Sequence, residues 1–123
     1  MSIRVLVTEP DFLLAKIYEQ FLTRKGFEVL TATSGRQCIE RLQEGKPDVL
    51  ILETDIRDGP ATEILQSMKR DTNGGAIPVV IVTRRKSSVG SIPFEAMFVK
   101  PVAMEELSRR LEIVVEANAI KQT

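Results

Sequence analysis

Histidine and tryptophan are absent from this sequence of 123 residues, and cysteine occurs once. Without histidine the chain can build neither a Ser-His-Asp triad nor a Cys-His nucleophile pair. It also offers no histidine ligand to zinc and no imidazole that titrates near neutral pH. The single cysteine, Cys38, cannot form an internal disulfide, and one thiolate cannot build a metal site alone. We expect Cys38 to be a small buried apolar residue.

An excess of charge of either sign is also missing, because 17 Lys and Arg residues balance 17 Asp and Glu residues. This balance gives no general attraction to nucleic acid or to a membrane surface. No stretch approaches the roughly 20 apolar residues that cross a bilayer, and no long apolar leader follows Met1. The composition predicts one cytoplasmic domain over residues 1–119, with a flexible tail over residues 120–123.

Short β-branched runs alternate with segments of helical periodicity along the chain. Strands are expected over residues 3–7, 28–32, 49–52, 79–82 and 96–99. Four helices are expected. The first has an apolar stripe of Phe12, Leu13, Ile17, Phe21 and Leu22 that stops before Gly26, and the second begins with a capping box of Ser34 and Gln37. The third runs from Pro60 to about Asn73-Gly74-Gly75, and the fourth begins at Pro101. Nearly continuous apolar strands are typical of a sheet that is covered on both faces. The sequence therefore predicts an α/β fold, a doubly wound five-stranded parallel sheet with helices on both faces.

The interval over residues 84–93 breaks this alternation. Gly90 and Pro93 interrupt a helix there, and only Val89 and Ile92 can face inward. The helix between the last two strands is therefore expected to be short or irregular.

Polar residues follow four of the expected strands. They are Thr8 and Glu9 after the first, Glu53 after the third, Thr83 and Arg84 after the fourth, and Lys100 after the fifth. In a doubly wound sheet the carboxyl ends of the strands converge on one ligand-binding edge, so we expect one shared pocket, although polar strand ends are also common where they only meet water. Glycine-rich phosphate-binding loops are missing, so the sequence does not predict a nucleotide-binding enzyme.

Five segments stand in an order and spacing that point to one family. They are Val5-Leu6-Val7 before an acidic turn, Phe21-Leu22-x-Arg24-x-Gly26-Phe27-Glu28-Val29, Pro47-Asp48-Val49-Leu50-Ile51-Leu52, Pro78-Val79-Val80-Ile81-Val82-Thr83, and Phe98-Val99-Lys100-Pro101. Together they resemble the receiver domains of two-component response regulators over essentially the whole chain. The resemblance implies the CheY-like, flavodoxin-like fold that the periodicity also predicts.

The resemblance also implies a chemistry. In such domains an aspartate after the third strand takes a phosphoryl group from a histidine kinase, an acidic pair after the first strand holds Mg²⁺, and a lysine and a Ser or Thr contact the phosphoryl oxygens. The matching residues here are Glu53, Thr83 and Lys100. The candidate metal ligands are Glu9, Asp11 and Glu53, and the other residues expected in the pocket are Thr8 and Arg84.

Several positions depart from the family pattern. Glu53 replaces the aspartate, Pro10 stands where a carboxylate normally binds the metal directly, and Arg84 replaces a small residue. The loop Ile56-Arg57-Asp58-Gly59 lacks its usual proline, and Met97 stands at the aromatic switch position. The signalling chemistry of the family is thus put in doubt.

Charge counting sharpens this doubt. Glu9, Glu53, Lys100 and Arg84 together carry no net charge, so the pocket can satisfy itself by ion pairs and has little need of a metal. We predict that Glu53 pairs with Lys100 or with Arg84. The domain would then resemble a receiver that is permanently modified at its acceptor residue. In the alternatives, Glu53 and Lys100 point apart into water, or Glu53 or Asp55 slowly accepts phosphate, although Asp55 is expected to face a loop.

The leading interpretation is a non-enzymatic pseudo-receiver that binds a protein partner, either a histidine kinase or a downstream effector. It needs no cofactor, and at most weak Mg²⁺ binding is expected. The alternatives are an active phosphoacceptor with an atypical site and a small flavin or nucleotide binder. If two or more of Ile92, Phe94, Met97 and Phe98 are exposed, they form an apolar face for a partner or a homodimer.

Overall fold

The computed structural model describes residues 2–56, 60–70 and 76–121. Its strands are β1 (Arg4–Thr8), β2 (Glu28–Ala32), β3 (Val49–Leu52), β4 (Val79–Thr83) and β5 (Ala96–Val99). Its helices are α1 (Phe12–Arg24), α2 (Gly35–Glu44), α3 (Ala61–Arg70), the short 3₁₀ helix η1 (Lys86–Ser88) and α4 (Met104–Lys121). The strands form one parallel sheet in the order β2-β1-β3-β4-β5.

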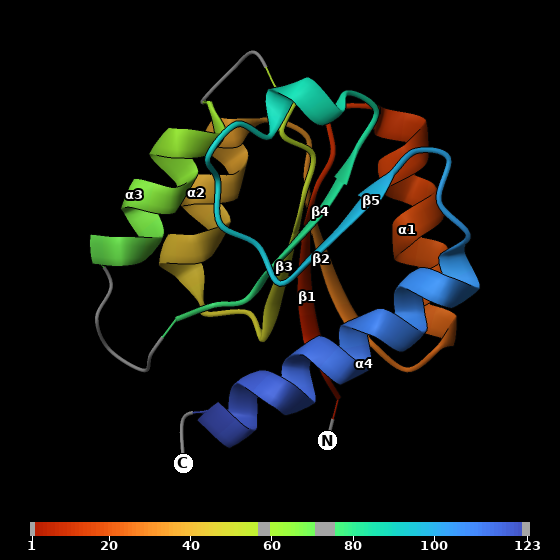
Figure 1. Cartoon of the computed structure of the whole chain (residues 1–123). Coiled ribbons are helices and arrows are strands. Elements are labelled where there is room, and N and C mark those ends of the chain that lie inside the picture. The colour runs from red at the N-terminus through yellow and green to blue at the C-terminus, as the bar shows by residue number, and fades with distance from the viewer. Residues whose placement is uncertain (1, 57–59, 71–75, 122–123) are drawn as a thin grey trace.

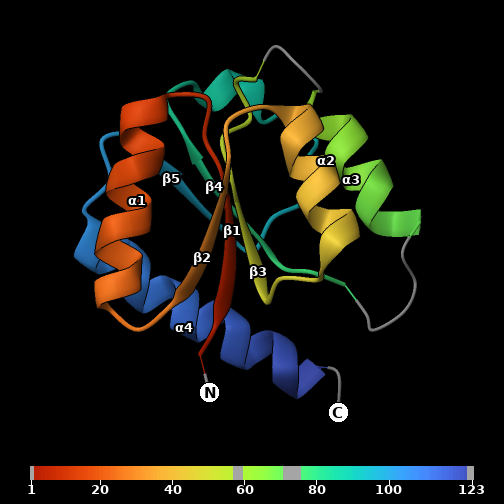
Figure 2. The same cartoon turned by 180° about the vertical axis from the view of Figure 1, so that it is seen from behind.

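Helices cover both faces of the sheet (Figure 1). Alternate residues of each buried strand point to opposite faces. In β1, Val5 and Val7 join the core under α1 and α4, whereas Leu6 joins the core under α2 and α3. Figure 2 shows the same two layers from behind. The predicted five-stranded, doubly wound architecture is confirmed.

The ends of the elements differ slightly from the prediction. α4 begins at Met104 and not at Pro101, because Pro101, Val102 and Ala103 carry the chain from β5 to the helix, and the Ala103 carbonyl accepts the hydrogen bond of Leu107. α4 continues through Lys121, past the boundary expected after residue 119. The segment between β4 and β5 contains only η1, as its Gly90 and Pro93 predicted. The predicted end of α3 near Asn73 and the loop over residues 57–59 lie outside the described residues.

Two helix ends use the predicted signals. Gly26 follows α1 with a φ of 96°, a conformation that favours glycine. Ser34 Oγ accepts the backbone N–H of Gln37 at 3.1 Å. The Gln37 side chain, however, accepts the N–H of Thr33 at 2.8 Å and not that of Ser34, so the second half of the capping box lies one residue earlier.

The expected apolar stripe of α1 does not form one buried face. Phe12, Leu13 and Ile17 are 70%, 75% and 50% exposed, whereas the core takes Ala15, Tyr18 and Leu22. The prediction that all five apolar residues share one face was wrong, because apolar residues occupy both sides of this helix. Among the four residues expected on a partner face, only Phe94 is exposed. Ile92 and Met97 pack under α2 and α3, and Phe98 packs against the core under α4. The condition for an apolar partner face, two or more exposed residues among these four, is therefore not met. Homodimerisation itself stays a prediction.

Because Leu13 and Ile17 lie in solvent, replacing either with Ser is expected to change the free energy of unfolding by no more than about 0.5 kcal/mol. Urea denaturation followed by circular dichroism measures this change. Leu22, which is fully buried on the same helix, is the matched control and must show a clear loss of stability on the same substitution. A loss as large at Leu13 as at Leu22 would mean that this face is covered.

Candidate functional site

A cavity of about 350 Å³ opens at the carboxyl ends of the strands. Its lining residues are Glu9, Pro10, Asp11, Leu14, Glu53, Asp55, Arg84 and Lys100. They come from the segments that follow β1, β3, β4 and β5 and from the first turn of α1. The shared pocket that the strand ends predicted is therefore present.

Lys100 lies between the two buried carboxylates of this cavity. Its Nζ donates to Glu9 Oε1 at 2.6 Å and to Glu53 Oε1 at 2.8 Å. The side chains of Glu9 and Glu53 are each 2% exposed, and that of Lys100 is 17% exposed. The prediction that Glu53 pairs with Lys100 agrees with this geometry, and the alternative in which the two point apart into water does not.

The remaining carboxylate oxygens are also engaged. Glu53 Oε2 accepts the backbone N–H of Asp55, and Glu9 Oε2 accepts that of Asp11, both at 3.0 Å. Burial alone would raise the pKa of Glu53, but the hydrogen bond from Lys100, with help from Thr83 and the Asp55 N–H, lowers that pKa. Burial would lower the pKa of Lys100, but its hydrogen bonds to Glu53 and Glu9 raise it. Both groups are therefore held in their charged forms.

Arg84 and Asp55 form a second ion pair at the rim of the cavity. Arg84 Nε lies 2.9 Å from Asp55 Oδ2, and Arg85 Nε lies 3.8 Å from the same oxygen. Asp55 thus lines the cavity, and the expectation that it faces a loop away from the pocket was wrong. The Arg84 guanidinium pairs with Asp55 and neutralises its charge. Arg84 donates to Glu53 through its backbone N–H, at 3.2 Å, and not through its side chain. The four groups counted from the sequence balance one another, but Asp11 and Asp55 also line the cavity, which gives it four carboxylates and the two cations Arg84 and Lys100. Arg85 adds a positive charge near Asp55.

The two predicted threonines do not line this cavity. Thr83 Oγ1 accepts the backbone N–H of Arg85 at 3.1 Å and lies 3.3 Å from both Thr54 Oγ1 and Ser88 Oγ. Thr8 is buried one residue before Glu9, within reach of the Cys38 thiol. Cys38 is buried as expected, and its burial raises the pKa of the thiol to about 11. Thr83 therefore acts on the site from behind the cavity wall, through the hydrogen bond that helps to lower the pKa of Glu53.

The residues present do not fit the magnesium ion that receiver domains bind. Asp11 Oδ1 accepts the N–H groups of Leu13 and Leu14 at 3.0 and 3.2 Å and so caps α1. Glu9 and Glu53 both hold Lys100, and Pro10 supplies no ligand. Over the described residues, no group of three or more His, Cys, Asp or Glu side chains is placed to hold a metal ion. The ammonium group of Lys100, and not a metal ion, lies between the carboxylates of Glu9 and Glu53.

If Asp11 acts as a helix cap, Asp11→Ala is expected to reduce the free energy of unfolding by about 1 kcal/mol. Asp11→Asn, which keeps an oxygen that can accept the same N–H groups, is the matched control and should lose much less. Denaturation in the presence and absence of MgCl₂ measures both variants. A loss in Asp11→Ala that appears only with added magnesium would assign the carboxylate to metal binding.

Sequence reasoning missed several residues of the site. Thr54 and Ser88 complete the hydrogen bonds around Thr83, and nothing in their sequence context marked them. The Tyr18 hydroxyl is buried and has no hydrogen-bond partner among the described residues. Burial raises the pKa of Tyr18, and the negative charges of Glu9 and Glu53 raise it further. The Tyr18 hydroxyl therefore lies within electrostatic range of both carboxylates.

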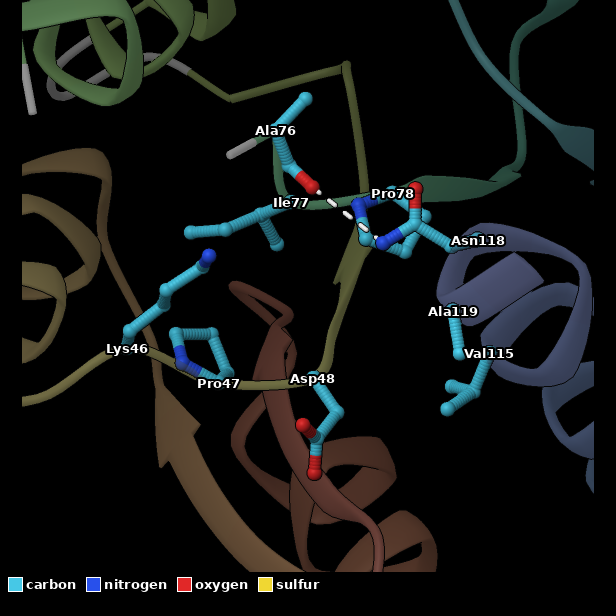
Figure 3. Close-up of a pocket in the computed structure, with 9 residues that line it drawn as sticks. All are labelled: Lys46, Pro47, Asp48, Ala76, Ile77, Pro78, Val115, Asn118 and Ala119. Carbon is cyan, nitrogen blue, oxygen red and sulfur yellow. Dashed lines mark hydrogen bonds between the residues drawn. The ribbon is translucent and has the colours of Figure 1, made fainter. Parts of the chain in front are cut away.

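A second cavity of about 180 Å³ lies at the amino ends of β3 and β4, beside the last turns of α4 (Figure 3). Figure 3 shows Asn118 directed toward Ala76, whose carbonyl accepts its side-chain N–H at 3.4 Å. Asp48 accepts the backbone N–H of Arg4 at 2.8 Å. These two polar side chains make structural contacts, and we assign no function to this cavity.

Comparison with known proteins gives the same fold and adds the family. The CheY-like response regulator receiver domain protein from Methanospirillum hungatei JF-1 superimposes with a TM-score of 0.85 at 16% identity, over 98% of this chain and 99% of that one. The receiver domain of sensor histidine kinase PA1611 from Pseudomonas aeruginosa PAO1, which has magnesium in its active-site cleft, gives 0.80 at 15% identity, over 94% and 99%. At these identities the likeness shows the CheY-like fold.

The family model for the response regulator receiver domain matches residues 5–112. The chain therefore belongs to the receiver domains of response regulators. Transcriptional regulatory protein YrkP of Bacillus subtilis, an uncharacterized protein, is 28% identical over 116 residues, or 90% of this chain and 48% of its own length. Transcriptional regulatory protein AfsQ1 of Streptomyces coelicolor is 25% identical over 124 residues, or 97% and 54%. The chain spans about half the length of these relatives. None of the helices over the described residues has the length and apolarity to cross a membrane.

Proposed function

We propose that this chain is a pseudo-receiver, a signalling module that acts through contacts with a protein partner and is not normally phosphorylated. One observation carries the proposal: Lys100 is paired with both Glu9 and Glu53, whose other oxygens accept backbone N–H groups. Attack on a phosphoryl group needs a carboxylate that is free to approach phosphorus and a cation that offsets the developing charge. Here the Glu53 carboxylate, at the acceptor position, is already bound to Lys100, the cation that would assist the attack.

The partner is a histidine kinase or a downstream effector, as the family of the chain suggests. Large apolar side chains exposed on α1 support a role in protein binding, because contiguous exposed apolar surface commonly marks interaction sites. The matched region is about half the length of the two transcriptional regulatory proteins to which the chain is similar. An output domain in a protein of that kind is one downstream effector that this chain would contact.

The decisive experiment adds excess MgCl₂ with acetyl phosphate, or with beryllofluoride as a phosphoryl mimic, to the purified protein. We expect no mass increase of one phosphoryl group and no shift of the Glu53, Asp55 and Arg84 amide resonances. A receiver domain with an aspartate at the acceptor position, treated alongside, confirms that the reagents are active. Labelling of this chain would overturn the proposal.

The second candidate function is an active phosphoacceptor with an atypical site. The observation that favours it is the position of Asp55, whose carboxylate lines the cavity although the sequence placed it elsewhere. Its carboxylate is held by Arg84 and is 24% exposed. If a phosphoryl group is gained, mass mapping of the modified peptide, with Asp55→Asn and Glu53→Gln as comparison variants, identifies the acceptor.

A further inference from the structure

The outer side of β2, here the β2 edge, has no strand beside it. The order β2-β1-β3-β4-β5 places β2 at one end of the sheet and leaves this side unpaired over the described residues. Figure 2 shows β2 between α1, on one face of the sheet, and α2, on the other. The β2 edge lies at the opposite end of the sheet from β5, and so from the face around Phe94 and Met97.

Two residues of β2 turn their backbone groups to this outer side. The Glu28 N–H and the Ala32 carbonyl are hydrogen-bonded across to the residues that flank β1, each at 2.9 Å. Backbone groups of successive residues in a strand point to opposite sides, so Glu28, Leu30 and Ala32 face β1. The N–H and C=O groups of Val29 and Thr31 therefore face outward.

The β2 edge carries few of the features that keep exposed strands from pairing. Such edges are commonly protected by proline, by lysine or by a charge that points inward. β2 contains neither proline nor lysine, and its charged residue, Glu28, stands at its first position and pairs with Arg4 at 3.6 Å. The Arg41 side chain approaches the edge, with Nε 3.4 Å from the Thr31 carbonyl oxygen. This bond is longer than the usual length of about 3 Å, so a second strand can displace it.

Apolar side chains flank the β2 edge on both faces of the sheet. Leu30 is 44% exposed on the face that α2 covers, and Phe12 is 70% exposed on the face that α1 covers. Phe12 and Thr31 line a hollow of about 80 Å³ between α1 and β2. The hollow also holds one charge of each sign, Lys16 and Glu19, so a second copy of the same surface is not repelled there.

We propose that the β2 edge is a dimerisation site, which pairs antiparallel with β2 of a second copy of this chain about a twofold axis at Leu30. In that register Val29 lies opposite Thr31 of the second copy, and such a pair exchanges two N–H···O bonds. The twofold axis repeats these bonds between Thr31 and Val29 of the second copy. The two Leu30 residues then form a non-hydrogen-bonded pair, with Cα atoms about 4.5 Å apart and side chains in contact.

A second copy fits the β2 edge because the two outward residues complement each other. Val29 and Thr31 are both β-branched, which favours a strand. The Glu28 carboxylates of the two copies lie at opposite ends of the paired strands, so like charges do not meet. Pairing of two copies covers both open edges at once, whereas a foreign extended segment leaves its own outer side open. The inference goes beyond the proposed function and does not depend on the chemistry of Glu53.

Cysteine cross-linking tests the register. Leu30→Cys places two thiols across the twofold axis at a Cα separation that a disulfide spans, so we expect a covalent dimer on mild oxidation with copper phenanthroline. Glu28→Cys, exposed on the same strand but opposite Ala32 of the second copy, is the matched control and should stay monomeric. The native Cys38 is fully buried and should not react. Equal cross-linking at residues 28 and 30 contradicts this register.

Sedimentation equilibrium at increasing protein concentration tests the association itself. Leu30→Lys puts like charges directly across the axis and should weaken dimerisation at least about tenfold. Thr31→Pro removes an outward N–H and no hydrogen bond to β1, and should weaken it as much. Leu13→Lys, the same change at a leucine that is 75% exposed on the outer face of α1, should leave the dissociation constant unchanged.

A wild-type chain that stays monomeric at about 1 mM overturns the proposal. A dimer that both Leu30→Lys and Thr31→Pro leave intact also overturns it, because such a dimer uses another face. Circular dichroism confirms the fold of each variant. If Thr31→Pro does not fold, Leu30→Lys and Leu30→Cys decide, because the Leu30 side chain is partly in solvent. These tests use no phosphoryl donor, so their failure leaves the proposed function standing.

Discussion

Replacing Lys100 with Met is expected to reduce the free energy of unfolding by about 3–5 kcal/mol at neutral pH, because it leaves two buried carboxylates without their shared cation. The carboxylates of Glu9 and Glu53 would face each other in a site that water hardly reaches. Urea denaturation of the purified protein measures the loss. Lys25→Met, which breaks an exposed pair of the same type, should cost no more than about 1 kcal/mol.

The pH dependence of this loss follows from the directions of the pKa shifts. In the native protein the pKa of Glu53 is lowered from 4.5, so its contribution to stability is present above that pH and is lost as the pH falls. The pKa of Lys100 is raised from 10.5, so its contribution is present below that pH and is lost at higher pH. In Lys100→Met the hydrogen bond and the charge of Lys100 are lost, and only Thr83 and the Asp55 N–H still oppose the effect of burial on Glu53. The pKa of Glu53 is therefore higher in the variant than in the wild type, and the stability lost by the substitution becomes smaller as the pH falls.

The stability curves of the wild type and Lys100→Met should therefore converge toward pH 4. Adding Glu53→Gln and Glu9→Gln to Lys100→Met removes the unpaired charges and should restore part of the stability at neutral pH. Equal losses at pH 4 and pH 7, or no rescue by the two amides, would show that packing of the Lys100 side chain and not its charge stabilises the site.

Much of the fold and the centre of the site were predictable from the sequence. Buried β-branched strands that alternate with helices determine the sheet, and a parallel sheet brings Glu9, Glu53 and Lys100 to one edge. Charge counting then predicted an ion pair at Glu53. It could not choose between Lys100 and Arg84, because that choice depends on whether the arginine presents its side chain or its backbone N–H to the carboxylate.

The rest of the site depends on the paths of loops, which residue periodicity does not determine. Asp55 reaches the cavity because the chain turns directly after Glu53, and Ser88 reaches Thr54 because η1 replaces a full helix. The exposure of Leu13 and Ile17 was missed for another reason. Apolar residues on both sides of α1 leave its orientation ambiguous until the neighbouring strands are in place.

Placing aspartate at positions 10 and 53, where the family pattern has acidic residues, should give the protein a magnesium site. Glu53→Asp shortens the side chain by one methylene, about 1.5 Å, and withdraws its carboxylate from Lys100 and the Arg84 N–H. Pro10→Asp adds a carboxylate at a residue that lines the cavity just before the Asp11 cap. Three carboxylates would then face one lysine, and the excess negative charge favours a hard divalent cation with oxygen ligands.

We expect the Pro10→Asp/Glu53→Asp variant to bind Mg²⁺ at least about tenfold more tightly than the wild type, a gain of 1.4 kcal/mol or more. Magnesium titration followed by amide resonances of the cavity measures the affinity, and thermal unfolding with and without MgCl₂ gives an independent readout. The matched control, Pro10→Asn/Glu53→Asn, has the same shape without the two charges and should not respond. If the aspartate variant binds Mg²⁺ no more tightly than the wild type and the amide variant, then charge balance around Lys100 is not what keeps magnesium out, and the cavity must exclude the ion by its shape.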